Sequence, residues 1–393
     1  MQPLKGVRIV EATANAAGPF GTGMLADQGA EVIRIEPLIH GDPSRHVGGT
    51  RGGISSYNAY MNRNKKSVAI DIKNPVAKEA LFELIKTADV FVQNSRPGAL
   101  ERAGLGFDAL HAINPQLIYV SISGFGMTGP AVHQRVYDAV IQAVAGLATA
   151  QGENGTPAMV KTIISDKVAG LTAAQAISSA LFARERGTIG GHHVEVSMLD
   201  ASLAFMWPDA YWNQGFVGAE GVTPKPMISD FYRVLRAKDG YATLLVVGDE
   251  DFAGACRGFD VPHVKANPKF KTLTSRFDHY DEMFSEFEKA AKKMTIADIV
   301  RLMDEGGVPC AKVNELEDVF TDPRVTHRDS IVEYDHPEGG RLRQPRAPAI
   351  FDEEPCPIRL PSPSLGEHTE EVLRSIGCDD DAIKQMRDAN AIG

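Results

Sequence analysis

An aspartate follows an apolar pair at the point where a helical pattern begins. Ile163-Ile164 precede Ser165 and Asp166, and a helix of small residues runs from Leu171 to Leu181. One interpretation is structural: Ser165 or Asp166 is an N-cap, whose oxygen accepts hydrogen bonds from free backbone N–H groups. The other is chemical: the helix dipole keeps the Asp166 carboxylate ionised, so that it can act as a nucleophile. The local residues leave both interpretations open.

The composition is that of an ordinary globular protein. Apolar residues make up 43% of the 393 residues and charged residues 23%, and this length allows two domains with buried cores. No apolar run is long enough to span a membrane, and the chain opens directly into a predicted strand without a signal-like segment. We therefore expect a cytoplasmic protein without a membrane partner. The net charge of −10 argues against nucleic acid, whose binding needs a basic face.

Neither a metal site nor a dinucleotide site is indicated. The cysteines are far apart and form no C-x-x-C pair, which predicts neither a zinc site nor a disulfide framework. They are Cys256, Cys310, Cys356 and Cys378. Gly18, Gly21 and Gly23 form G-x-x-G-x-G and not the G-x-G-x-x-G of dinucleotide-binding loops. We expect no bound metal and no nicotinamide cofactor.

Predicted strands and helices alternate through residues 7–122. They are strand 7–10, helix 18–27, strands 31–35 and 67–72, helix 75–87, strand 89–92, helix 99–113 and strand 117–122. This pattern predicts a Rossmann-like α/β domain with a mostly parallel sheet. Ligands of such sheets bind outside the carboxyl ends of the strands. Loops rich in Gly, Pro and polar residues follow those ends, at 12–19, 36–37, 94–98 and 123–130.

The rest of the chain predicts a second, smaller α+β domain. Helices 137–147 and 166–186, strand 193–196 and helix 198–212 continue the large domain. A hairpin around Lys238-Asp239-Gly240, charged helices at 280–305 and a strand at 309–313 form the small one. The predicted boundaries are 1–214 for the first part of the large domain, 215–226 for a linker, 227–322 for the small domain, 323–350 for a return linker and 351–393 for the C-terminal part of the large domain.

Several segments, taken together, carry a family resemblance. They are 4–10 with Ala17-Gly18-Pro19, 25–37 with Gly41-Asp42, 62–67, 88–94 with Arg96-Pro97-Gly98, Asn114-Pro115 with Gly124-Phe125-Gly126, Tyr137-Asp138 with Gln142-Ala143, and 365–369. In order and spacing the chain resembles the class III coenzyme A-transferases, the CaiB/BaiF family. The resemblance implies an interlocked homodimer: each ring-like subunit has a Rossmann-like large domain and a small domain joined by two linkers, and its partner threads through it.

The resemblance implies the chemical role for Asp166. In the family this carboxylate attacks an acyl-CoA thioester, giving a mixed anhydride and then an aspartyl-CoA thioester, and an acceptor carboxylic acid reverses both steps. A coenzyme A thioester would be the cosubstrate, without a prosthetic group or metal. The implied CoA-binding residues are Ala14, Asn15, Ala16, Ala17, Ile70, Lys73, Asn94, Arg102, Arg135 and Tyr137.

Two features depart from the family's formyl-CoA transferases. Those enzymes have a glutamine at the position of Ala16, and their glycine-rich lid has no counterpart between Gly215 and Asp230. Oxalate is therefore doubtful as the acceptor. A pocket for a dicarboxylate would need a cation, for which Arg45 and Arg51 are candidates.

Two other functions stay open. The α-methylacyl-CoA racemases of the same superfamily use a His-Asp pair where this chain has Tyr137-Asp138. Racemisation needs two acid–base groups, and tyrosine, with an ordinary pKa near ~10, is a poor substitute for histidine. The substitution favours the transferase. The third hypothesis is a non-catalytic homologue that only binds acyl-CoA.

Overall fold

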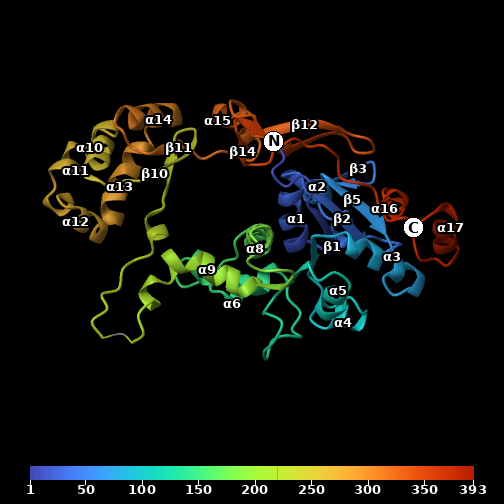
Figure 1. The fold of residues 1–393 in the computed structure, drawn as a ribbon. Coiled ribbons are helices and arrows are strands. Elements are labelled where there is room, and N and C mark those ends of the chain that lie inside the picture. Colours follow the sequence, from blue (N-terminus) through green and yellow to red (C-terminus); the bar gives the residue numbers. More distant parts are fainter. Residues whose placement is uncertain (219) are drawn as a thin grey trace. The chain divides into compact units, whose positions relative to one another are not determined.

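The computed structural model describes residues 1–218 and 220–393, which form two compact units (Figure 1). The first unit comprises Met1–Pro208 and His327–Gly393, and the second comprises Asp209–Thr326. Both ends of the chain therefore belong to the first unit, and the chain passes between the units twice. Ala219, in the predicted linker 215–226, lies outside the described residues. Across the described ranges, no helix is long and apolar enough to cross a membrane.

A six-stranded parallel sheet forms the centre of the first unit. Its spatial order is β5-β2-β1-β6-β7-β8, and every neighbouring pair is parallel. The bounds are β1 Arg8–Ala12, β2 Glu31–Glu36, β5 Lys65–Ala69, β6 Val90–Gln93, β7 Ile118–Ser123 and β8 His193–Ser197. The predicted α/β fold with a mostly parallel sheet is confirmed. Strand order reverses between β1 and β6, and this switch point is where such sheets bind ligands.

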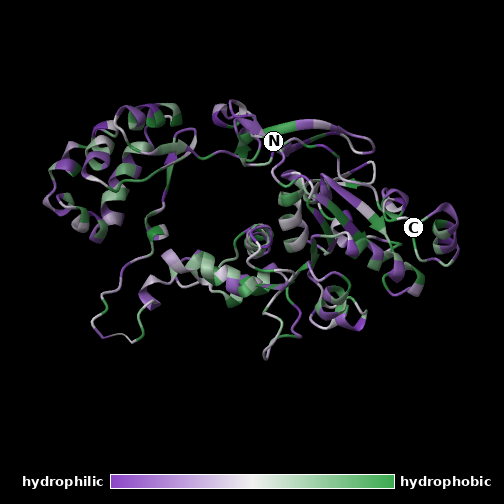
Figure 2. Ribbon diagram, viewed as in Figure 1, coloured by the Kyte–Doolittle hydropathy of each residue, from purple (hydrophilic) through white to green (hydrophobic). Residues whose placement is uncertain are grey.

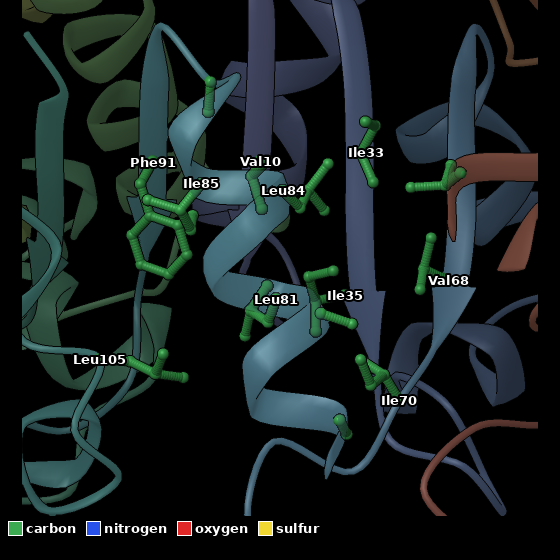
Figure 3. Packing of buried hydrophobic residues seen from close by; sticks show 14 of the residues in the cluster. Val10, Ile33, Ile35, Val68, Ile70, Leu81, Leu84, Ile85, Phe91 and Leu105 are labelled. Atoms are coloured by element: carbon green, nitrogen blue, oxygen red, sulfur yellow. The ribbon is translucent and has the colours of Figure 1, made fainter. Parts of the chain in front are cut away.

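Helices cover both faces of the sheet. On one face α3 (Pro75–Lys86) packs on the strands, and Figure 3 shows its Leu84 beside Val10 and its Leu81 beside Ile35. On the other face lie α1 (Ala17–Asp27) and α8 (Ile164–Glu185), which contact β1, β7 and β8 and pack closely on each other. Other elements of the first unit are β3 Thr50–Arg51, β4 Ile54–Ser55, α2 Ser56–Asn62, β12 Ile331–His336, β13 Gly340–Pro345, β14 Ile350–Phe351, β15 Glu354–Pro355, α16 Thr369–Ser375 and α17 Asp380–Asp388. Helix α9, Met198–Ala210, spans the boundary between the two units after Pro208.

Two predicted helices, 99–113 and 137–147, are each divided in the structure. Glycines with left-handed φ lie at the divisions, 71° at Gly104 and 77° at Gly146. A helix does not continue through a left-handed residue, and glycine adopts this conformation without strain. The resulting helices are α4 Ala99–Arg102, α5 Phe107–Ile113, α6 Asp138–Val144 and α7 Leu147–Gln151.

The second unit has a small antiparallel sheet and a helical cover. The hairpin predicted around Lys238-Asp239-Gly240 is present as β9 and β10, and β11 pairs with β10. Buried side chains such as Leu235, Phe287 and Met303 form its core. The bounds are β9 Val234–Ala237, β10 Gly240–Leu244, β11 Cys310–Lys312, α10 Asp249–Gly258, α11 Pro262–Ala266, α12 Leu273–Asp278, α13 Tyr280–Ala291, α14 Ile296–Glu305 and α15 Pro323–Thr326.

The sheet face beneath α1 carries buried charges. Successive side chains of a strand point to opposite faces, so Ile33 and Ile35 of β2 lie in the apolar core while Arg34 and Glu36 lie on the other face. Both charged side chains are almost completely buried. We call the charged groups on this face the ionic layer. Its members are Glu11, Arg34, Glu36, Asp42, Arg45 and Lys65.

Lys65 links the ionic layer to α1. Its ammonium donates to Glu11 Oε1 at 2.9 Å, to the Pro19 carbonyl at 2.9 Å and to the Thr22 hydroxyl at 2.8 Å, so all three of its donors have partners. Burial lowers the pKa of Lys65 to about 8, although the Glu11 charge acts in the opposite direction. The ion pair of Lys65 and Glu11 is therefore buried in a site where either charge without the other would destabilise the fold.

Lys65→Met is predicted to destabilise the first unit by about 3–5 kcal/mol, because it leaves the buried Glu11 without the ammonium that hydrogen-bonds to it. Urea unfolding at neutral pH measures the loss. The double variant Glu11→Leu/Lys65→Met removes both charges and should lose clearly less. Lys86→Met is the control, since its pair with Glu83 is exposed and should contribute less than about 1 kcal/mol. Equal losses for Lys65→Met and Lys86→Met would contradict this account.

Candidate active site

Two loops are tied together at the switch point of the sheet. Asn94, directly after β6, accepts a hydrogen bond from the Ala14 N–H and donates one to the Ala14 carbonyl, both at 2.8 Å. Ala14 lies in the loop after β1. The reciprocal pair fixes the loops after the two central strands at one separation, so the carboxyl edge of the sheet has a defined shape there.

The ionic layer holds the loop after β1. Asn15 has a left-handed φ of 63°, which asparagine tolerates better than most residues. Its N–H donates to Asp42 Oδ2 at 2.9 Å. The same oxygen lies 2.9 Å from the guanidinium of Arg34, which is fully buried. The buried charges therefore position the backbone that leads into α1.

Helix α8 begins without a cap from its own sequence. Its N-cap residue is Ile163, so the interpretation of Ser165 or Asp166 as the N-cap is wrong. Asp138, the first residue of α6, supplies the missing acceptor: its Oδ1 accepts from the Ser165 N–H at 2.6 Å and from the Asp166 N–H at 3.2 Å. Gln142 donates to the other oxygen of Asp138 at 2.6 Å. The Asp166 side chain is therefore not used for capping.

Asp166 is a carboxylate with a perturbed pKa. Burial raises the pKa of Asp166 to about 6 and the Asp138 charge raises it too, while a hydrogen bond from the backbone of Ala17 lowers it. Ala17 is the first residue of α1, so the N-termini of α1 and α8 meet at this carboxylate. Burial, Asp166 and Asp42 together raise the pKa of the nearby Tyr57 to about 12. Such perturbation at a cavity marks a candidate functional site.

Asp166 lines a cavity of about 320 Å³ at these loops. Seven of the predicted site residues line it: Ala14, Asn15, Ala17, Asn94, Arg135, Tyr137 and Asp166. The structure therefore brings together residues that are more than 150 positions apart in the chain. Tyr137 is 72% exposed, so the cavity is open to solvent on its side.

Four predicted residues do not line this cavity. Ala16 is buried in the same loop, where it is the N-cap of α1. Ile70 is 3% exposed and belongs to the apolar core. Lys73 and Arg102 are exposed, after the carboxyl ends of β5 and β6. Their roles stay predictions.

Arg45 and Arg51 do not line the cavity either. Arg45 binds Glu36 at 2.6 Å in the ionic layer, and Arg51 donates to the carbonyl of Gly339. Neither is the cation for a dicarboxylate in this cavity, so that expectation was wrong. Within residues 1–218 and 220–393, no group of three or more His, Cys, Asp or Glu side chains is placed to hold a metal ion.

Other cavity residues were missed among the sequence-derived site residues. They are Ser95, Arg96, Pro97, Ile122, Ser123, Gly124, Phe125, Gly126, Ala131, Val132, Gln134, Val136 and Met198. The loops 94–98 and 123–130 did carry a signal, because they follow strand ends. Arg96 and Arg135 are the cations of the lining; both are exposed, and neither forms an ion pair with another described residue.

Asp166→Asn is predicted to stabilise the protein at high pH. In the folded chain the pKa of Asp166 rises from 3.8 to about 6, so ionisation is penalised relative to the unfolded chain. This loss of stability is absent when the pH is below the pKa of the unfolded chain. It grows as the pH rises between the two pKa values and is complete above the pKa of the folded chain. We expect urea unfolding to give up to about 3 kcal/mol more stability than wild type near pH ~8 and no difference near pH ~4.

Asp200→Asn, an exposed change on α9, is the control and should alter stability little at either pH. An Asp166→Asn variant that is less stable than wild type at the higher pH would contradict the burial argument.

Comparison with known proteins identifies the family. The chain is 33% identical over 398 residues to the succinyl-CoA:glutarate CoA-transferase of Homo sapiens, covering 100% of this chain and 90% of the relative. It is 33% identical over 370 residues to the acetyl-CoA:oxalate CoA-transferase of Acetobacter aceti, covering 93% of each. A crystal structure of a CAIB/BAIF family protein from Brucella suis matches with a TM-score of 0.82 at 30% identity, covering 95% of this chain and 99% of that one. The model of CoA-transferase family III matches residues 4–369. The chain belongs to CoA-transferase family III and is an enzyme of this class.

Proposed function

We propose that this enzyme transfers coenzyme A between carboxylic acids with Asp166 as the nucleophile. The observation that carries the proposal is a carboxylate in a cavity at the switch point whose pKa burial raises to about 6. Such a group is more basic than an ordinary carboxylate and is still mostly ionised at neutral pH. Greater basicity makes the oxygen a better nucleophile toward a thioester carbon.

In the first half-reaction coenzyme A moves from the donor acyl group to the Asp166 side chain. A carboxylate oxygen of Asp166 attacks the thioester carbon, the C–S bond breaks, and the electron pair leaves on the CoA thiolate. The product is a mixed anhydride. The thiolate then attacks the Asp166 carbonyl of the anhydride, and the donor acid leaves as a carboxylate with one oxygen from Asp166. Asp166 is left as an aspartyl-CoA thioester.

The acceptor acid runs the same steps in reverse. Its carboxylate attacks the aspartyl-CoA thioester, expels the thiolate and forms a second anhydride. The thiolate attacks the acceptor carbonyl, and the Asp166 carboxylate is released together with the new acyl-CoA. No proton has to move in this sequence, because every nucleophile and leaving group is an anion. Thioester and anhydride are similarly activated, so the transfer needs no external energy source.

The start of α1 is suited to stabilise the anions along this path. Each attack on a carbonyl produces an oxyanion, and backbone N–H groups at a helix N-terminus stabilise developing negative charge. The N–H groups of Ala16 and Ala17 are the donors we assign, since Ala17 already contacts Asp166. Asp138 keeps the main chain of Asp166 in place through the bonds at 2.6 and 3.2 Å to the start of α8.

The anionic part of coenzyme A is assigned to the cations at the carboxyl edge of the sheet. Arg96 and Arg135 lie at the cavity, and Lys73 and Arg102 lie on exposed segments after β5 and β6. Guanidinium and ammonium groups are the side chains that phosphates prefer. Asn94 contributes by fixing the loop that carries Arg96.

A transfer assay tests the proposal. The enzyme is incubated with succinyl-CoA and either glutarate or oxalate, acids that appear in the names of the relatives, and new acyl-CoA is measured by mass spectrometry. Wild type should form the product with at least one of the two acids, Asp166→Asn should lose about a thousand-fold or more in that rate, and Asp200→Asn should match wild type.

Two results would overturn the proposal. One is turnover by Asp166→Asn at the wild-type rate. The other is exchange of the α-hydrogen of a 2-methylacyl-CoA in deuterium oxide without any acceptor acid, which would indicate racemase-type chemistry.

We also propose that the enzyme is an interlocked homodimer. The chain leaves the first unit after Pro208 and returns at His327, as a threaded ring requires. Helices α8 and α9 also carry exposed apolar side chains: Leu171 is 46% exposed, Phe182 68% and Phe205 55%. Figure 2 shows hydrophobic residues along α9. Apolar surface of this kind is typical of a protein interface.

Light scattering at micromolar concentration should give twice the chain mass of 42.4 kDa. Phe182→Glu/Phe205→Glu should weaken association, because charges would then have to be buried in an apolar interface. Lys86→Glu, an exposed change on α3, serves as the control and should leave the dimer intact. A wild-type protein with the mass of one chain would contradict the proposal.

A further inference from the structure

Helices α1 and α8 cross at two glycines. A Cβ on Gly21 would lie 2.6 Å from the carbonyl oxygen of Gly170, and a Cβ on Gly170 would lie 2.7 Å from the carbonyl oxygen of Ala17. Real Cβ atoms essentially never come this close to another atom. The nearest obstructing atom is a backbone oxygen in both cases, so a side-chain rotation cannot relieve the contact. The two helices can therefore approach this closely only without a Cβ at either position.

The crossing lies one helical turn beyond the reacting group. Gly170 follows Asp166 by four residues on α8, and Gly21 follows Ala17 by four residues on α1. Residues four apart lie on one face of a helix, about one turn from each other. The face that forms the crossing is thus the face on which the Ala17 N–H meets the Asp166 carboxylate. The separation of the helices at the glycines fixes the separation of that pair.

Neither glycine is required by its own backbone conformation. Both lie inside helices, and neither is among the described residues with positive φ. Glycine in a helix interior costs roughly 0.5–1 kcal/mol relative to alanine. In an ordinary helix the alanine variants would be more stable. The glycines here have a different function, which is to allow the close approach.

We infer that Gly21 and Gly170 are positioning residues of the transfer reaction. The absence of two Cβ atoms sets the distance between the N-terminus of α1 and the Asp166 carboxylate. This inference rests on the proposed function of Asp166. It assigns neither glycine a contact with the substrate.

Adding a Cβ at the crossing should affect the chemical step more than binding. A helix displacement of a few tenths of an ångström or more moves the α1 N–H groups away from Asp166 and from the oxyanion. Misplacement by about 1 Å costs on the order of a hundred-fold in rate. The hydrogen bond from Ala17 lowers the pKa of Asp166, so its loss moves the acid limb of the kcat/KM profile to higher pH. The cations assigned to coenzyme A lie elsewhere, so KM should change little.

The test compares Gly170→Ala, Gly21→Ala and the double variant with Lys86→Ala, an exposed change on α3. We expect each glycine variant to lose about ten- to a hundred-fold in kcat with little change in KM. The acid limb of its kcat/KM profile should lie at higher pH than that of wild type. The double variant should lose much less than the product of the two single effects, because one Cβ already opens the crossing. Lys86→Ala should match wild type.

Unfolding experiments and Asp166→Asn complete the design. The inference is overturned if a folded Gly170→Ala or Gly21→Ala keeps the wild-type kcat and pH profile, or if both variants fail to fold, which would make the glycines purely structural. If Asp166→Asn is inactive while Gly170→Ala is unchanged, only the present inference fails. If Asp166→Asn is active, the proposed function itself fails.

Discussion

The ionic layer under α1 is the interaction on which the geometry of the site depends. Arg34 is completely buried, and its pairing with Asp42 places the oxygen that holds the Asn15 N–H. Burial alone would raise the pKa of Glu36, but hydrogen bonds from Arg45 and the charge of Arg34 hold that pKa at about 2. Removing one partner from such a layer leaves an uncompensated charge, which costs several kcal/mol. The loop after β1 is therefore held in one conformation by the sheet itself.

The same loop leads into α1, whose N-terminus faces a carboxylate that the fold keeps in an unfavourable environment. Asp138 performs the capping that Asp166 would otherwise perform, and its own charge makes ionisation of Asp166 harder. The buried charge of Asp166 thus lowers the stability of the folded chain, while the raised pKa makes the carboxylate a stronger base for the proposed reaction. This trade is common at active sites, where the residues best suited to the reaction are seldom the most stabilising ones.

Part of this arrangement could be predicted from the sequence. Alternating strands and helices predicted a parallel sheet, and loops rich in Gly and Pro after strand ends predicted where the cavity lies, because both follow from local patterns. The strand order that creates the switch point does not follow from any local pattern. The bonds of Asp138 to α8 join residues 27 and 28 positions apart, and no local pattern marks such a contact. Arg34 and Glu36 alternate with isoleucines as they would in a half-exposed strand, so their complete burial carried no signal.

The oxygen atoms of Asp166 provide the most direct test of the central claim. In the proposed sequence one oxygen of each acceptor carboxylate remains on Asp166 when the new acyl-CoA leaves. Turnover with an acceptor acid carrying a heavy-oxygen label should therefore place the label in the Asp166 peptide, as measured by mass spectrometry after proteolysis. The label should be absent from the Asp138 peptide and from enzyme incubated without an acyl-CoA. Formation of product without label in Asp166 would contradict the account, because the acids would then exchange coenzyme A without passing through this carboxylate.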